Sequence, residues 1–459
     1  MFVVRDHVKN RKIGWLFILL ALLALAFGAW RILPLLEKES PTVTFSGWKP
    51  ALGLASTFAV TVSDHKSGLK KVAISLLANG REYALAEYSG PGPKVQVVKS
   101  RQFDISLEPA KMGIPDGRAL LRVLAQDYSW RGFLKGNRTY IEKEVTIDTR
   151  KPEVEVLSRQ HYINQGGAGL VIYRVFEPGT VHGVQVGEKF FPGYAGQLDN
   201  ADVCLAFYAV AHDQPPEVSL MVSVTDAAGN TARAGFYHLI KAKAFPEDRI
   251  VISDGFLNMK MPEFDVPAAV DNSLEKFKII NSDMRARNNE TIRSQCARSD
   301  GSRHWQGTFL RFPNSAPRAG FADRRVYEYN GKFIGRAVHM GVDLASTANS
   351  PVPAANNGRV AFAGNIGIYG RAVIIDHGLG LFSLYSHLSH IAVAADQSVE
   401  KGDIIGRSGM TGLAGGDHLH YGMLVHDTCV NPIEWWDASW IANNITDKME
   451  MIRQTLAVK

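Results

Sequence analysis

Two histidines separated by a single leucine, His418 and His420, occur in the stretch GGDHLHYG near the C-terminal end of the chain. Side chains alternate faces along an extended strand, so both imidazoles project from one face and Leu419 from the other. Two imidazoles on one face suit a metal site, because neutral imidazole is a common zinc ligand. A half-buried or exposed pair of strand histidines has the same spacing, so this motif alone leaves both interpretations open.

Other histidines are concentrated near this motif. Seven of the 14 histidines fall within residues 339–426. His339 and Asp343, in HMGVD, are four residues apart, which places them on one face of either a helix or an extended segment. The intervening Gly341 favours the extended alternative. His387 follows the alternating residues of LGLFSLYSH, so we expect it at the end of a strand.

These residue types suit hydrolysis assisted by a divalent metal. Two imidazoles and one carboxylate can hold zinc and leave a fourth coordination position for water. A nearby imidazole can accept the proton of that water as it attacks a carbonyl, and another can stabilise the oxyanion. The helical H-E-x-x-H pattern of zinc proteases does not occur in this sequence.

Five stretches within residues 318–436 occur in the same order as the motifs of one known protein family. They are HMGVDLAS, SPVPAANNGRVAFAG, IYGRAVIIDHGLGLFSLYSHLS, VEKGDIIGRSGMTGLAGGDHLHYGM and VNPIEWW. Together they resemble the lysostaphin-like (LytM-domain) zinc endopeptidases, which cut peptidoglycan peptides. The resemblance implies a compact antiparallel β-sheet domain with the site in a groove on one sheet face. It implies Zn²⁺ as the cofactor and peptidoglycan peptides as the substrate. The implied metal ligands are His339, Asp343 and His420, and the implied catalytic residues are His387 and His418.

The sequence departs from the family pattern at two positions that hold no ligand. Ala322, in FADRR, replaces the Gly of the family's F-G-x-R-R strand, and Asp417 stands where many members have Pro. Three further histidines match no family ligand, and we expect structural or exposed roles for His377, His390 and His426. The three cysteines, Cys204, Cys296 and Cys429, are too widely spaced for a cysteine zinc site and can form at most one disulfide.

An apolar segment near the N-terminus predicts a membrane anchor. Residues 13–30, IGWLFILLALLALAFGAW, carry no charge, and a helix of this length covers about 27 Å, close to the thickness of the hydrocarbon core. An N-terminus inside the cytoplasm is favoured by the basic residues that precede this segment, Arg5, Lys9, Arg11 and Lys12. A cleaved signal peptide is the alternative, which the long run and the bulky Trp30 disfavour.

The predicted topology is a single pass through the cell inner membrane. Residues 1–12 would form a cytoplasmic tail and residues 13–36 the transmembrane anchor. The remaining chain, with the enzyme domain, would then lie in the periplasm or outside the cell.

The segment after the anchor has the pattern of β-sandwiches. Alternating apolar residues before Asn79-Gly80 predict a strand, a tight turn and a second strand. An Asp, then Gly-Asn, then an alternating strand occurs near residues 127–147 and again near residues 226–240, which is a faint internal repeat. The repeat resembles bacterial immunoglobulin-like modules, so we expect two of them, at residues 41–149 and 150–242, acting as a spacer or stalk.

Residues 243–317 are expected to form a linker with one amphipathic helix. Asn272 is a capping residue, and the apolar residues that follow it recur at helical spacing. This linker precedes the predicted site, so it is a candidate for self-inhibition. His304 is the candidate occupant of an open zinc position, and a surface histidine is the simpler interpretation. Residues 437–459 are expected to be a C-terminal tail.

Composition agrees with a mainly β chain of several domains. The 459 residues are 46% hydrophobic and 21% charged, which is typical of globular protein and suggests two to four domains. The net charge is +6, but the sequence contains no dense basic tract, so we expect no nucleic-acid partner. The expected activity is a zinc metalloendopeptidase. The alternatives are a non-catalytic wall-binding protein, an activator of another wall hydrolase, or an adhesion scaffold, and the sequence indicates no protein partner.

Overall fold

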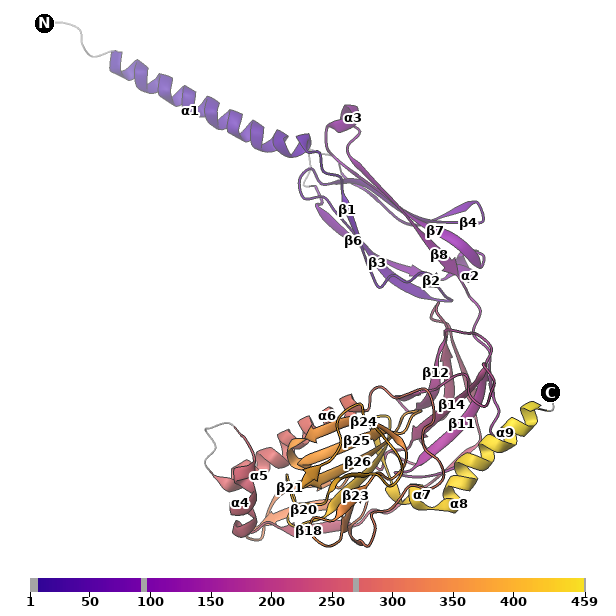
Figure 1. Cartoon of the computed structure of the whole chain (residues 1–459). Helices are drawn as coiled ribbons and strands as arrows, with labels where there is room; N and C mark the ends of the chain where they lie inside the picture. The colour runs from indigo at the N-terminus through magenta and orange to yellow at the C-terminus, as the bar shows by residue number, and fades with distance from the viewer. Residues whose placement is uncertain (1–6, 92–96, 267–271, 458–459) are drawn as a thin grey trace, which may run out of the picture. The chain divides into compact units, whose positions relative to one another are not determined.

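The computed structural model describes residues 7–91, 97–266 and 272–457, and most of its regular structure is β-strand (Figure 1). The chain folds into two compact units. The N-terminal unit comprises residues 1–151 and 225–231, and the C-terminal unit comprises residues 152–224 and 232–459. The mainly β fold expected from the sequence is therefore confirmed, whereas the boundaries of the smaller domains stay predictions.

The predicted anchor lies in a long helix, α1 (His7–Ile32), continued by the 3₁₀ turn η1 (Leu33–Leu36). Residues Trp15–Leu36 have a mean hydropathy of 2.4, and none of these residues is buried in the protein. This length and composition suit a membrane span, and an N-terminal signal sequence has the same properties. Arg5, one of the predicted cytoplasmic charges, lies outside the described residues.

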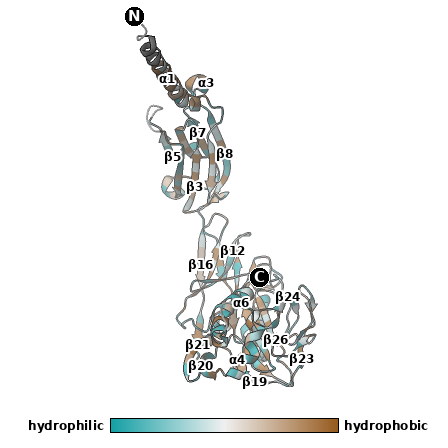
Figure 2. Cartoon of the chain, turned by 90° about the vertical axis from the view of Figure 1, so that its left-hand side faces the viewer, coloured by the Kyte–Doolittle hydropathy of each residue, from teal (hydrophilic) through white to brown (hydrophobic). Residues whose placement is uncertain are grey.

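Two antiparallel sheets form the body of the N-terminal unit. The first has the order β1 (Thr42–Ser46), β3 (Ser56–Ser63) and β6 (Ser100–Leu107). The second has the order β2 (Ala51–Leu52), β8 (Arg138–Ile147), β7 (Gly117–Asp127), β4 (Leu69–Ala78) and β5 (Arg81–Ser89), and only its short β2–β8 pair is parallel. Strands β3 and β7 carry both hydrophobic and hydrophilic residues (Figure 2), and their inward side chains share one core between the sheets. The short helices are α2 (Pro109–Met112) and α3 (Arg131–Leu134).

The hairpin turn predicted for this region is confirmed. Asn79 and Gly80 join β4 to β5 with φ angles of 49° and 75°, the positive values that a tight hairpin turn requires. The repeated Asp and Asn make the same contacts twice. The Asp127 carboxylate accepts hydrogen bonds from the backbone and side-chain amides of Asn137, and the Asp226 carboxylate accepts the same pair from Asn230. The repeat is therefore a loop-closing device.

The C-terminal unit begins with three small sheets. One has the order β14 (Val203–Ala209), β11 (Ala168–Val175) and β9 (Val154–Val156), and a second has the order β13 (Lys189–Pro192), β12 (Val181–Val186), β15 (Leu220–Thr225) and β16 (Thr231–Gly235). The third is a parallel pair, β10 (His161–Asn164) and β17 (His238–Lys241). Every residue of β14 is buried, because this sheet packs through Phe207 against Trp305 and Trp435 farther along the chain.

The segment 243–317 contributes a strand and helices to the C-terminal unit. Strand β18 (Glu247–Val251) precedes α4 (Asp254–Lys260) and the 3₁₀ turn η2 (Met261–Glu263). The predicted helix is confirmed as α5 (Ser273–Ile279), a π turn η3 (Ile280–Met284) and α6 (Arg285–Gln295). Asn272 caps it, because its side chain accepts a hydrogen bond from the backbone N–H of Leu274. Strand β18 pairs with β20 (Arg324–Tyr329), which pairs with β21 (Lys332–Val338).

The large antiparallel sheet predicted for residues 318–436 is present. Its order is β19 (Ala316–Ala319), β22 (Val342–Ala345), β30 (Leu419–Val425), β26 (Leu381–Leu388), β25 (Arg371–Asp376), β24 (Gly358–Asn365) and β28 (Ser398–Val399), with β31 (Thr428–Val430) beside β30. All residues of β26 and β30 are buried. Phe382 and Leu424 share a core with Phe277 of α5, while Tyr385 and Met423 belong to the core on the other face.

Shorter elements complete this domain. A second sheet has the order β23 (Pro351–Pro353), β29 (Ile404–Arg407) and β27 (His390–Ile391), and the 3₁₀ turn η4 spans Gly367–Tyr369. The predicted C-terminal tail is helical, and its elements are α7 (Pro432–Trp436), α8 (Ala438–Ile441), the π turn η5 (Ala442–Thr446) and α9 (Asp447–Ala457). Figure 1 shows α9 beside strands β11 and β14 of the same unit.

Candidate active site

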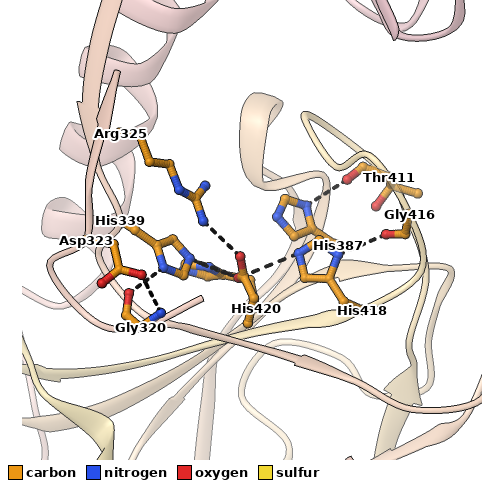
Figure 3. Close-up of polar contacts among 10 residues, drawn as sticks. Gly320, Asp323, Arg325, His339, His387, Thr411, Gly416, His418 and His420 are labelled. Atoms are coloured by element: carbon orange, nitrogen blue, oxygen red, sulfur yellow. Dashed lines mark hydrogen bonds and ion pairs between the residues drawn. The ribbon is translucent and has the colours of Figure 1, made fainter. Parts of the chain in front are cut away.

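Three elements bring His339, Asp343 and His420 together. His339 directly follows β21, Asp343 lies in β22, and His420 lies in the adjacent antiparallel strand β30. Asp343 and His420 are register partners, so the sheet places their side chains side by side. The segment around His339 is not helical, as Gly341 indicated. Figure 3 shows His339 and His420 converging below Arg325.

The three side chains form a compact triangle of possible ligand atoms. His339 Nε2 lies 2.9 Å from Asp343 Oδ1 and 2.9 Å from His420 Nδ1, and the same Oδ1 and Nδ1 atoms are also 2.9 Å apart. All three residues are buried. Such a group of two imidazoles and a carboxylate has the donor set of a zinc site with an open fourth position.

Hydrogen bonding shows which nitrogen of His339 faces the triangle as an acceptor. Its Nδ1 lies 2.7 Å from the carbonyl oxygen of Gly320, which only accepts, so Nδ1 carries the proton in the neutral ring. Nε2 then presents a lone pair toward Asp343 Oδ1 and His420 Nδ1. In tetrahedral zinc sites with zinc–ligand distances of about 2.0–2.1 Å, the ligand atoms lie about 3.3 Å from one another. A small outward movement of the three side chains would therefore make room for the ion.

Gly341 is needed where the His420 ring approaches the backbone. A Cβ atom at this position would lie 2.7 Å from His420 Nε2 and 2.6 Å from the Tyr421 carbonyl oxygen. Both distances are too short for real contacts, so a side chain here would displace the candidate ligand. The glycine of HMGVD therefore has a packing role in the site.

Arg325 holds the outer oxygen of Asp343, a contact that the motif FADRR alone did not reveal. Its Nη2 lies 3.0 Å from Asp343 Oδ2, which leaves Oδ1 directed at the histidines. Burial would raise the pKa of Asp343, but hydrogen bonds and charges, those of His339 foremost, bring this pKa well below its usual value of 3.8. The carboxylate is therefore ionised, as metal binding requires.

Two other residues of FADRR support His339. Asp323 Oδ2 accepts a hydrogen bond from the Gly320 backbone N–H at 2.6 Å, and Gly320 in turn accepts from His339. Ala322 has φ of 63°, and its N–H donates to the His339 carbonyl. This left-handed backbone explains the expected glycine at position 322, since glycine adopts it without a Cβ clash. These partners fix the tautomer and the orientation of the imidazole.

His387 and His418 lie beside the triangle, as the sequence predicted. Their ring centroids are 4.8 Å apart, and the His387 centroid is 5.8 Å from that of His420. His387 is the penultimate residue of β26 and has φ of 62°. Its Nδ1 donates to the Thr411 carbonyl at 2.8 Å, so its Nε2 is unprotonated in the neutral ring. His418 Nδ1 bonds the Gly416 carbonyl, and Nε2 is 3.5 Å from Asp343 Oδ1.

The two flanking imidazoles have opposite pKa shifts. Burial, followed by the charges of His418 and His420, lowers the pKa of His387 well below its usual value. Burial also opposes the charged form of His418, but the Asp343 carboxylate outweighs it and raises the His418 pKa. One neutral imidazole and one that readily holds a proton thus face the same space.

The remaining histidines of the domain have structural contacts or are exposed, as the sequence predicted. His377 is buried, with Nδ1 donating to the Asn357 carbonyl and Nε2 bonded to Ser383 Oγ. His426 stacks on Tyr194 with centroids 6.1 Å apart. His390 is exposed on β27.

Two further expectations concern loops near the site. Asp417 accepts hydrogen bonds from Ser408 Oγ and the Asn349 N–H, so it closes the loop where family members have Pro. His304 pairs with Asp300 at 3.1 Å and does not line the cavity above the triangle, so the structure contradicts its predicted place over the metal position.

The triangle opens into a cavity of about 310 Å³. Its wall includes residues 250–252, Phe256 and Phe277 from the segment 243–317, together with Arg325 and Tyr369. The segment before the peptidase sheet therefore borders the site through its first half, upstream of His304. The structure places all three cysteines as free thiols.

The fold and the site define a β-sheet domain with the donor set of a metallopeptidase. Residues 337–432 match the model of Peptidase family M23, so the chain contains a domain of this family. This confirms the relationship predicted from the five motifs.

Sequence relatives agree with this family. The chain is 41% identical over 96 residues to the DD-carboxypeptidase/endopeptidase Mpg of Neisseria meningitidis serogroup B, covering 21% of this chain and 22% of the relative. It is 34% identical over 132 residues to the peptidoglycan DD-endopeptidase ShyA of Vibrio cholerae, covering 28% of this chain and 30% of the relative. The matches thus span less than a third of these curated relatives.

One solved structure to which this chain is similar is the catalytic domain of lysostaphin from Staphylococcus simulans. It is 29% identical, and the match covers 26% of this chain and 90% of that domain with a TM-score of 0.23.

Proposed function

We propose that the chain is a membrane-anchored zinc metalloendopeptidase that hydrolyses peptide crosslinks of peptidoglycan. The observation that carries the proposal is the triangle of His339 Nε2, Asp343 Oδ1 and His420 Nδ1, with three mutual distances of 2.9 Å. Three acceptor atoms at this spacing repel one another unless a cation or protons lie between them. The buried ionised carboxylate and the fixed tautomer of His339 favour a divalent cation over shared protons.

Zinc, when bound by these three residues, would supply a polarised water and a Lewis acid for the scissile carbonyl. The protein's own residues account for the proton transfers. His387 is neutral and its Nε2 is free of the Thr411 bond, so it can accept a proton from an attacking water. His418, whose pKa is raised, can donate a hydrogen bond to the oxyanion that develops on the carbonyl.

The relatives and α1 support the proposed substrate class and location. Two relatives carry names that include endopeptidase, one of them a peptidoglycan DD-endopeptidase, which supports peptidoglycan peptides as the substrate of this chain. The apolar residues Trp15–Leu36 support a single-pass anchor in the inner membrane with the peptidase domain on the periplasmic side.

The test uses the whole chain purified in detergent. We expect about one zinc per chain by elemental analysis, and release of crosslink-derived muropeptides from purified peptidoglycan. Chelation should abolish release and added zinc should restore it. Zinc binding without muropeptide release would favour the non-catalytic wall-binding alternative, and release that survives complete zinc removal would contradict the proposal.

A further inference from the structure

A second cavity of about 830 Å³ lies in the C-terminal unit, and of the described residues none lines both this groove and the metal cavity. Its walls come from the strand pair β10 and β17 and from the helical C-terminal residues 440–451. We call it the β10–α9 groove. Its side chains have no part in the chemistry proposed above.

Lys448 is the unusual member of the groove. It lies in the first turn of α9 with 8% of its surface exposed. Within the described ranges its ammonium forms no hydrogen bond or ion pair, and it is not fully enclosed, so the largely buried side chain reaches the open space of the groove. Burial lowers the pKa of Lys448 to about 8. A largely desolvated ammonium that keeps contact with a groove and has no internal partner is free to pair with an anion that enters the groove.

Cations outnumber carboxylates among the described residues around Lys448. The adjacent His161 is neutral, because burial lowers its pKa to about 4, and its ring nitrogens bond Tyr237 O and Ser158 Oγ. The lining contains two more cations, Arg159 and Lys241, against the single carboxylate of Asp447. The groove therefore carries a net positive charge around a buried ammonium.

The rest of the lining suits a polar chain with amide or hydroxyl groups. Tyr162 exposes 50% of its surface, and Trp440 lines the opposite side from the helical segment. The amides of Gln160 and Asn443 are exposed there and can both donate and accept hydrogen bonds. Aromatic faces with amides and cations are a suitable surface for an anionic peptide or saccharide.

We infer that the β10–α9 groove binds a carboxylate-bearing segment of the cell-wall polymer, with the Lys448 ammonium as its anchoring contact. The choice of wall polymer, and with it of a carboxylate, rests on the proposed function, whereas the need for an anion rests on the lining itself. A stem peptide of peptidoglycan offers carboxylates beside amides, which matches the groove in charge and hydrogen bonding. Such a site would hold the polymer to the enzyme between successive cleavages.

The experiment measures binding of monomeric N-acetylmuramyl tetrapeptide to the zinc-loaded whole chain by calorimetry. Lys448→Met keeps the apolar stem of the side chain and removes its charge. The affinity of the peptide for the β10–α9 groove should therefore fall about tenfold or more, the range for a lost charge-assisted hydrogen bond. Amidating the peptide's carboxyl groups should weaken binding to the wild-type chain similarly. Lys332→Met, a change at the exposed lysine that begins β21, is the matched control and should bind like wild type.

Three measurements keep the result interpretable. Lys448→Met should melt no lower than wild type, because it removes a partly desolvated charge that has no internal partner, and this result would show that the variant folds. Unchanged peptide affinity in this variant overturns the inference. Lys448-dependent binding to phosphatidylglycerol vesicles, with none to the peptide, overturns the choice of wall polymer.

The proposed binding in the groove and the proposed peptidase activity can be refuted independently. If the chain releases no muropeptides but binds the tetrapeptide through Lys448, the proposed function fails and the groove assignment stands. If the chain releases muropeptides and Lys448→Met binds as wild type does, the groove assignment fails and the peptidase stands.

Discussion

Asp343 and His420 are register partners on the neighbouring strands β22 and β30, and their Oδ1 and Nδ1 atoms lie 2.9 Å apart. Backbone pairing thus holds two of the three candidate ligands, while His339 enters from the end of β21. A site built on a sheet has little freedom to compensate for the loss of one ligand.

Replacing His339, Asp343 or His420 by Ala should each abolish zinc retention and activity, because two ligands chelate zinc too weakly. Elemental analysis of dialysed protein measures this directly. His418→Ala, two residues before His420 in the sequence, is the matched control and should retain zinc. Zinc kept by His420→Ala but lost by His418→Ala would reverse the assignment of ligands.

His387→Ala and His418→Ala should keep zinc and fold but lose about two to four orders of magnitude in turnover, the range for removing a general base or an oxyanion donor. Initial rates of muropeptide release at equal zinc loading decide this. His390→Ala removes an exposed histidine of the same domain and should turn over normally. A near wild-type rate in either test variant removes that residue from the catalytic step.

Arg325→Gln should reduce zinc affinity or activity by about 10- to 100-fold, because it frees the Asp343 Oδ2 atom that Arg325 holds at 3.0 Å. Its neighbour Arg324 is exposed on the same strand, so Arg324→Gln is a closely matched control. Competition with a zinc chelator measures affinity separately from turnover. Equal zinc affinity and equal rates in the two variants would show that the ion pair does not support the site.

Stability of the C-terminal unit should fall as the pH drops from about 6.5 toward 4. Burial lowers the pKa of His377 to about 4, so the unfolded chain binds its proton at a higher pH than the folded chain does. His377 stabilisation is thus present above pH 6.5 and declines by about 1.4 kcal/mol per pH unit below it. Denaturant unfolding of wild type and His377→Gln at several pH values should show a smaller slope in the variant. Equal slopes would contradict the shifted pKa.

The topology predicts that added protease reaches the peptidase domain in spheroplasts. Residues Trp15–Leu36 would cross the membrane once, and everything C-terminal to them would lie outside the cytoplasm. Immunoblotting with a C-terminal tag should show degradation in intact spheroplasts, while a cytoplasmic marker survives. A protected tag in intact spheroplasts, degraded only after lysis, would refute this orientation.

Much of the site followed from the sequence because its signals are local. Period-two alternation placed His418 and His420 on one face, the spacing of His339 and Asp343 placed them together, and Asn79-Gly80 required a tight turn. Family motifs then suggested which side chains bind metal. These patterns depend on backbone geometry over a few residues, so no knowledge of distant contacts was needed.

Only the tertiary structure decided which distant residues meet. The sequence did not show that Asp343 pairs in register with His420 or that Arg325 holds the second Asp343 oxygen. Nor did it show that residues 250–252, Phe256 and Phe277 border the site while His304 does not. It also left Lys448 as one lysine among many in a predicted tail. Strand pairing and burial bring together residues tens to hundreds of positions apart, and a local pattern carries no record of that pairing.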